Sequence, residues 1–112
     1  MKPTKLANAL IDEEEWRQVL SSLVVCFFAR GIYDIDTVVR SLATSGFQIK
    51  PEDLQRIGHE ILLAKQSFKR REGFESKQLR LPKRIFETPS TGKPFDEGYL
   101  RQGIAAAEKH WS

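Results

Sequence analysis

The sequence predicts an all-α domain over residues 1–112, with about four helices and a long extended strap between the third and the fourth. Apolar residues recur at spacings of three and four in several stretches, which is the period of an amphipathic helix. Acidic residues and a proline precede these stretches and glycines follow them, as is typical of helix ends. Three prolines interrupt the pattern between about residues 75 and 95, which predicts the strap.

The first helix is predicted from about Asp12 to Ala29, and residues 1–11 are expected to form an N-terminal tail. The carboxylates of residues 12–15 would then lie at the positive end of the helix dipole. Val24, Val25 and Phe28 widen the apolar stripe to nearly the whole circumference, which predicts burial on several sides. The stripe itself consists of Trp16, Val19, Leu20, Leu23, Cys26 and Phe27.

The second and third helices have clearer boundaries. Asp34 or Asp36 is expected to cap the second, which ends at about Thr44 before a glycine. The third begins near Pro51 and ends near residue 73. Gly58 falls on the buried stripe of this helix, and a residue without a side chain there predicts close approach of a neighbouring helix.

The strap, residues 75–95, contains Pro82, Pro89 and Pro94, and a connection of this length is expected to wrap a surface or serve a site. The last helix is predicted from its cap Asp96 to Trp111. Its inner face and the apolar residues that hold the strap are expected to be Tyr99, Leu100, Ile104, Ala107 and Trp111, and Leu79, Leu81, Ile85 and Phe86.

Composition sets the broad class. The net charge of +3 comes from 18 Lys and Arg against 15 Asp and Glu, so the chain is only mildly basic. Cys26 is the single cysteine, which excludes an intrachain disulfide and suits a reducing cytoplasm. The longest apolar run is far shorter than the roughly 20 residues of a membrane span, and no secretory signal is predicted.

Five segments of the chain carry recognisable motifs. They are Val38–Phe47, Gln55–Ile61, Phe68–Phe74 with its Arg-Glu-Gly-Phe turn, Leu81–Arg84 with its Leu-Pro-Lys-Arg sequence, and the final helix that ends at Trp111. These segments resemble the C-terminal region of the aldehyde ferredoxin oxidoreductase family. They occur in the family's order over residues 16–111, and together they make a chance resemblance improbable.

The resemblance implies an oxidoreductase that acts on aldehydes or related substrates at tungsten or molybdenum held by two pterins, with a nearby [4Fe-4S] cluster. In the family, the fourth cluster cysteine lies in an Asp-x-x-Gly-Leu-Cys motif, which aligns with Ser21–Cys26. Cys26 is therefore the candidate fourth cluster ligand, and Ser21 occupies the pterin-contact position. Serine replaces the aspartate and Val24 replaces the glycine, whose absence of a side chain lets backbone approach a bulky cofactor.

Cys26 and the basic residues between 65 and 84 also have other interpretations. A lone cysteine on an apolar stripe is commonly a buried small hydrophobe. The basic residues between 65 and 84 fit either a solvated helix end or a docking surface for phosphate or an acidic partner. His59 and His110 lack the spacing of a metal site. The basic residues concerned are Lys65, Lys69, Arg70, Arg71, Lys77, Arg80, Lys83 and Arg84.

Two hypotheses follow. In the first, the chain is a C-terminal domain or fragment of an aldehyde oxidoreductase-like protein, inactive alone and without cofactor in isolation. Its partners would be the upstream domains or a partner subunit of that enzyme, or a second copy bound through an exposed apolar face. In the second, it is a stand-alone helical interaction module whose basic strap docks an acidic protein or nucleic acid.

Overall fold

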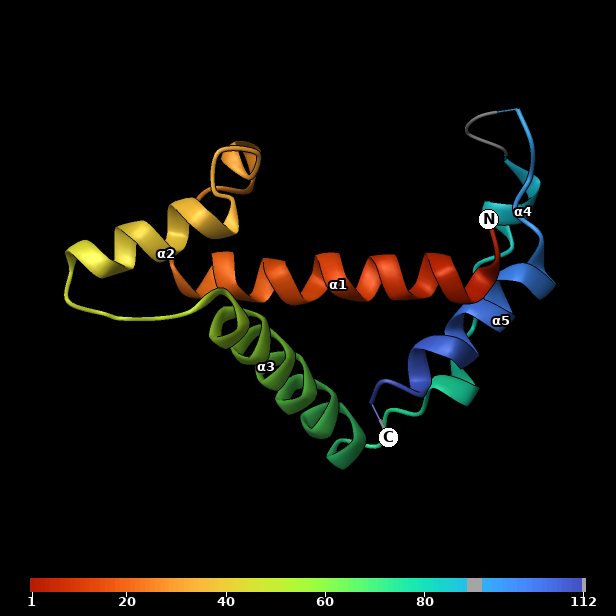
Figure 1. Ribbon diagram of the computed structural model, residues 1–112. Helices are drawn as coiled ribbons and strands as arrows, with labels where there is room; N and C mark the ends of the chain where they lie inside the picture. Colours follow the sequence, from red (N-terminus) through yellow and green to blue (C-terminus); the bar gives the residue numbers. More distant parts are fainter. Residues whose placement is uncertain (89–91, 112) are drawn as a thin grey trace. The chain divides into compact units, whose positions relative to one another are not determined.

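The computed structural model describes residues 1–88 and 92–111, and every regular element among them is helical, which confirms the all-α prediction (Figure 1). Pro89, which the predicted strap includes, lies outside the described residues. The chain divides into two compact units: unit 1 is Met1–Ile11 with Gln66–Ser112, and unit 2 is Asp12–Lys65. The elements are α1 (Pro3–Ser22), η1 (Phe27–Ala29), α2 (Ile35–Thr44), α3 (Pro51–Arg71), η2 (Ser76–Gln78), α4 (Arg84–Glu87) and α5 (Glu97–Glu108).

The predicted N-terminal tail is wrong, because α1 already begins at Pro3. Proline favours the first helical position, where its missing N–H loses no hydrogen bond. Ala7 and Ile11 lie one helical turn apart and are 6% and 5% exposed, so this part of the helix has a buried face. The acidic residues 12–15 therefore lie inside the helix, and their interpretation as its start is wrong.

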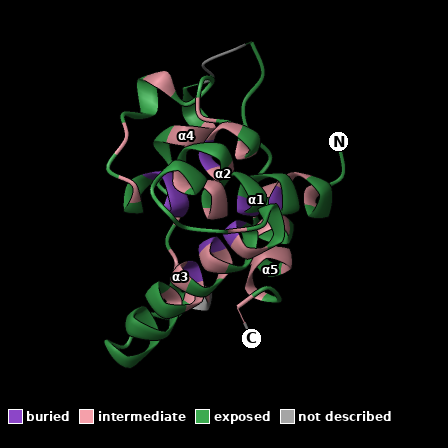
Figure 2. Cartoon of the chain, turned by 60° about the vertical axis from the view of Figure 1, so that its left-hand side comes forward, coloured by how far each residue is buried: buried purple, intermediate pink, exposed green. Residues whose placement is uncertain are grey.

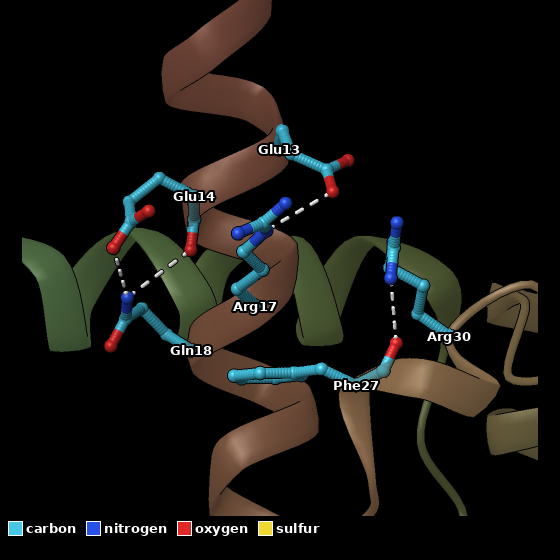
Figure 3. Close-up of polar contacts among 6 residues, drawn as sticks. All are labelled: Glu13, Glu14, Arg17, Gln18, Phe27 and Arg30. Atoms are coloured by element: carbon cyan, nitrogen blue, oxygen red, sulfur yellow. Dashed lines mark hydrogen bonds and ion pairs between the residues drawn. The ribbon is translucent and has the colours of Figure 1, made fainter.

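Two of these carboxylates, those of Glu13 and Glu14, accept hydrogen bonds from side chains one turn further along α1. Arg17 Nε donates to Glu13 Oε1 at 3.1 Å, and Gln18 Nε2 donates to Glu14 Oε1 at 2.9 Å (Figure 3). Both pairs are four residues apart, which brings the side chains together on one helix face.

The C-terminal end of α1 was also predicted wrongly, since the helix stops at Ser22 and not at Ala29. Val25 N donates to Leu20 O at 3.3 Å and Val24 N donates to Ser21 O at 3.1 Å. This pair of bonds is the Schellman motif, in which the residue after the cap adopts the left-handed conformation. Val24 is that residue, with a φ of 58°, although glycine is usual there.

Unit 2 has its core where α1, α2 and α3 meet (Figure 2). Val19, Val38 and Leu54 supply one buried side chain from each helix. Asp34 caps α2 by accepting a hydrogen bond from Thr37 N at 2.8 Å, which decides between the two predicted caps. Partly buried residues packed against this core are Trp16, Leu23, Tyr33, Ile35, Val39, Leu42 and Ile49.

The close approach predicted at Gly58 is confirmed. A Cβ added to Gly58 would lie 3.0 Å from Glu15 C and 3.3 Å from Val19 Cγ2, and it would clash outright with the Glu15 carbonyl oxygen. Beside this crossing, His59 Nδ1 lies 2.6 Å from Glu15 Oε1. The His59 side chain is thus engaged by a carboxylate from α1.

Unit 1 joins the N-terminal part of α1 to residues from the end of the chain. Asp96 caps α5 as predicted, by accepting from Tyr99 N at 2.7 Å, and α5 ends at Glu108, before Trp111. Tyr99 Oη donates to Met1 O at 2.8 Å, and His110 Nε2 lies 2.9 Å from Asn8 Oδ1.

The strap is less extended than predicted, because it contains the short helical turns η2 and α4. Its apolar residues Leu79, Leu81, Ile85 and Phe86 are all partly buried, which agrees with their predicted role in holding it to the rest of the unit. No helix in the described part of the chain is long and apolar enough to cross a membrane.

Candidate functional site

An apolar segment follows the end of α1, and we call residues 23–32 the exit segment. Val24, Phe28 and Ile32 are 90%, 97% and 69% exposed. Phe28 was predicted to lie on a buried stripe, and that prediction is wrong because the helix ends before reaching it. An exposed group of large apolar side chains is typical of a surface that another protein covers.

Local hydrogen bonds fix the backbone of the exit segment. Ala29 N donates to Cys26 O at 3.1 Å and closes the short helix η1. Arg30 Nη1 donates to Phe27 O at 2.9 Å (Figure 3). The apolar side chains are therefore presented by a turn that has its own hydrogen bonds, in place of an unstructured loop.

The two candidate site residues lie at this end of α1. Cys26 is exposed, so the interpretation of it as a buried small hydrophobe is wrong. Ser21, in the last turn of α1, is also exposed. Among the described residues, no group of three His, Cys, Asp or Glu side chains could hold a metal ion.

Sequence reasoning missed a groove in unit 2, which we call the acidic groove. Its volume is about 840 Å³. Four carboxylates and a single guanidinium line it together with apolar and aromatic side chains. The lining residues are Asp12, Glu15, Trp16, Val19, Arg30, Tyr33, Asp34, Ile35, Asp36, Leu54 and Gln55. The acidic residues were interpreted only as helix starts, which hid the fact that α1 and α2 bring them together.

One of these carboxylates has a perturbed pKa. The hydrogen bond that Asp34 accepts from the backbone N–H of Thr37 lowers the pKa of its carboxyl group, because the bond favours the charged form. Asp34 therefore stays ionised in the acidic groove at neutral pH.

The basic region is solvated where the structure describes it. Lys69, Arg70 and Arg71 form the last turn of α3, where cations interact favourably with the helix dipole. Lys69 Nζ lies 5.8 Å from the ring centre of Phe74. Phe68 and Phe74, at the two ends of the segment Phe68–Phe74, are both exposed. Docking of an acidic partner here stays a prediction.

Comparison with known families places the chain in a described family. A family described as "Aldehyde ferredoxin oxidoreductase, domains 2 & 3" matches residues 1–107. The chain belongs to the aldehyde ferredoxin oxidoreductase family. No curated protein and no solved structure matches it.

Membership in the aldehyde ferredoxin oxidoreductase family bears on the left-handed backbone conformation of Val24. The positive φ of Val24 occurs at the position that the sequence resemblance pairs with a glycine of the family motif, and glycine is the residue that adopts this conformation without strain. The valine side chain projects into space that a glycine would leave open for a neighbour.

The described residues do not by themselves fit the family's cofactors. A [4Fe-4S] cluster needs about four thiolates, and Cys26 is the only cysteine of the chain. Ser21 offers a hydroxyl in place of a charged acceptor for pterin N–H groups.

Proposed function

We propose that this chain is a helical C-terminal piece of an aldehyde ferredoxin oxidoreductase-type protein, which contributes to a tungsto- or molybdopterin and iron–sulfur oxidoreductase without being catalytic alone. It does so by docking on the upstream domains or a partner subunit that carries the cofactors. The observation that carries this proposal is the exposure of Val24, Phe28 and Ile32 on both sides of Cys26.

The energetics support the exit segment as an anchor. Full burial of a large apolar side chain contributes about 1.5–3 kcal/mol, so three such residues contribute on the order of 5 kcal/mol. Association costs roughly as much or more in lost translational and rotational freedom, so further contacts must add to the affinity. Removing one anchor should still weaken the complex strongly, because binding energy concentrates in a few buried residues.

Docking is tested by co-expressing the tagged chain with the polypeptide that carries the pterin-binding domain and a three-cysteine cluster motif. The wild-type chain is expected to co-purify with it, and Phe28→Asp to lose most of this binding. Phe47→Asp is the matched control, since Phe47 is 58% exposed and lies in the same unit outside the exit segment. Equal binding by all three chains would refute the proposal.

Cys26 has its own test within the same complex. If the exposed thiol completes the cluster, Cys26→Ser should lower the iron content and the visible absorbance of the purified complex, while co-purification persists. Ser22→Ala, which alters a neighbouring exposed residue, serves as the control. Unchanged iron content in Cys26→Ser would show that this cysteine is not a ligand.

A cytoplasmic location belongs to this proposal, because a free exposed thiol and iron–sulfur chemistry both suit a reducing compartment. The second hypothesis, a stand-alone module that docks an acidic protein or nucleic acid through its basic strap, explains neither the exposed apolar side chains of the exit segment nor the family membership. The helix dipole is enough to account for the basic residues at the end of α3.

A further inference from the structure

The chain separates its charge between the two units. Unit 2 carries nine Asp and Glu against six Lys and Arg, a net charge of −3. Unit 1 carries twelve Lys and Arg against six Asp and Glu, a net charge of +6. The small overall charge of +3 therefore conceals two regions of opposite sign, each able to attract the other region of a second molecule.

Four of the carboxylates that make unit 2 negative line the acidic groove. Of its four carboxylates, Glu15 is engaged by His59 and Asp34 by the first turn of α2. The side-chain carboxylates of Asp12 and Asp36 have no hydrogen bond or ion pair with any described residue. The groove thus offers two unpaired carboxylates above an apolar wall that includes Trp16 and Leu54.

Part of the positive charge of unit 1 lies on basic residues of the strap. Arg80, Lys83 and Arg84 are exposed, and the described residues give their side chains no hydrogen-bond or ion-pair partner. The apolar residues interleaved with them, Leu79, Leu81, Ile85 and Phe86, are partly buried, so residues 79–86 of the strap are held in place while these three cations face solvent.

We propose that the acidic groove binds the strap of a second copy of this chain, with Arg80 and Lys83 opposite Asp12 and Asp36. The contact joins two different surfaces, so it is heterologous and leaves one groove and one strap free at the ends of each assembly. It uses neither the exposed apolar side chains of the exit segment nor Cys26, and it does not depend on the proposed oxidoreductase role.

Sedimentation velocity over a range of protein concentrations tests the contact. The wild-type chain should associate in about 0.1 M salt and dissociate in about 1 M salt, because the screening length falls from about 10 Å to about 3 Å. The dissociation constant should rise at least about tenfold over that range. A monomer at every concentration in low salt overturns the proposal.

Variants locate the contact. The groove variant D12N/D36N and the strap variant R80Q/K83Q should each remain monomeric alone, and an equimolar mixture should form a 1:1 dimer and nothing larger. That dimer shows both variants to be folded, since each supplies its intact surface. The control E52Q/E60Q changes the charge of unit 2 equally outside the groove and should associate like the wild type.

Failure of the mixture to dimerise, or equal weakening by the control, contradicts the proposal. The exit-segment variant Phe28→Asp should self-associate normally while losing its cofactor-bearing partner. The two proposals can therefore fail independently of each other.

Discussion

Replacing Val24 by glycine should stabilise the protein. Val24 occupies the left-handed position of the Schellman motif at the end of α1, with a φ of 58°. For a residue with a Cβ this conformation costs roughly 1–2 kcal/mol, and a β-branched side chain is a particularly poor occupant. Glycine removes that cost.

Two smaller effects oppose the gain. Glycine adds about 0.5–1 kcal/mol of backbone entropy to the unfolded chain. Val24 is 90% exposed, so losing its side chain forfeits only about 0.2 kcal/mol of burial. The net expectation is a stabilisation of about 0.5 kcal/mol, and close to 1 kcal/mol if the strain lies at the upper end of its range.

Urea denaturation of the whole chain, followed by circular dichroism, measures the change. Val24→Ala is the matched control, because it removes the branched side chain but keeps the Cβ and therefore most of the strain. The reasoning is refuted if Val24→Gly is less stable than the wild type. It is also refuted if Val24→Ala gains as much as Val24→Gly, since the backbone conformation would then not be the cause.

Three further predictions concern the helices. Gly58→Ala should destabilise the chain by about 2 kcal/mol, because the added Cβ meets the backbone of α1. The control Gly31→Ala has open space around it and should change the midpoint of urea denaturation little. In the same assay, Ile11→Ala should lower the free energy of unfolding by about 2–4 kcal/mol. Leu10 is 61% exposed, so Leu10→Ala should lower it by under about 0.5 kcal/mol. Equal effects of the two variants would indicate that residues 1–11 form an unpacked tail. Because the folded-state pKa of Asp34 is lowered, its stabilisation is present above the unfolded pKa and is lost as pH falls through the folded pKa. Asp34→Asn should therefore flatten the acid side of the stability–pH profile, and an unchanged profile would contradict this.

Periodicity and end signals predicted α2, α3 and α5 because their patterns and caps agree. Asp34 and Asp96 each precede an apolar face and each accept a hydrogen bond in the first turn. The close approach at Gly58 was predictable because a glycine on a buried stripe adds no apolar area to the core and leaves room for the backbone of a neighbouring helix. In these elements, local sequence and packing favour the same structure.

The boundaries of α1 could not be read in the same way. The helix ends at Ser22, and the left-handed residue of the turn after it is Val24, inside an apolar run. Neither composition nor periodicity distinguishes a strained left-handed valine from a helical one. The family motif, with glycine at that position, was the signal that could have revealed the turn. At the other end, Pro3 with Ala7 and Ile11 at helical spacing indicated a helix, but the acidic run after them resembled a better start.

The candidate site, too, could be predicted only in part from the sequence. The resemblance proposed Cys26 and Ser21 as candidates, whereas the turn that exposes Cys26 depends on the early end of α1, which periodicity did not reveal. The acidic groove escaped notice because Asp12 and Asp36 are far apart in sequence and come together only through packing. A site assembled from separate helices leaves no local motif.

The division of the chain into units also sets an order for its synthesis and folding. Unit 2 is a continuous stretch of 54 residues and can complete its core from contacts of short sequence separation as soon as it leaves the ribosome. Unit 1 must wait, because Met1 and Asn8 find their partners in Tyr99 and His110, at sequence separations of 98 and 102. Residues 1–11 are synthesised before unit 2 but are fixed after it, and loss of α5 should leave unit 2 folded while Met1 and Asn8 lose these partners.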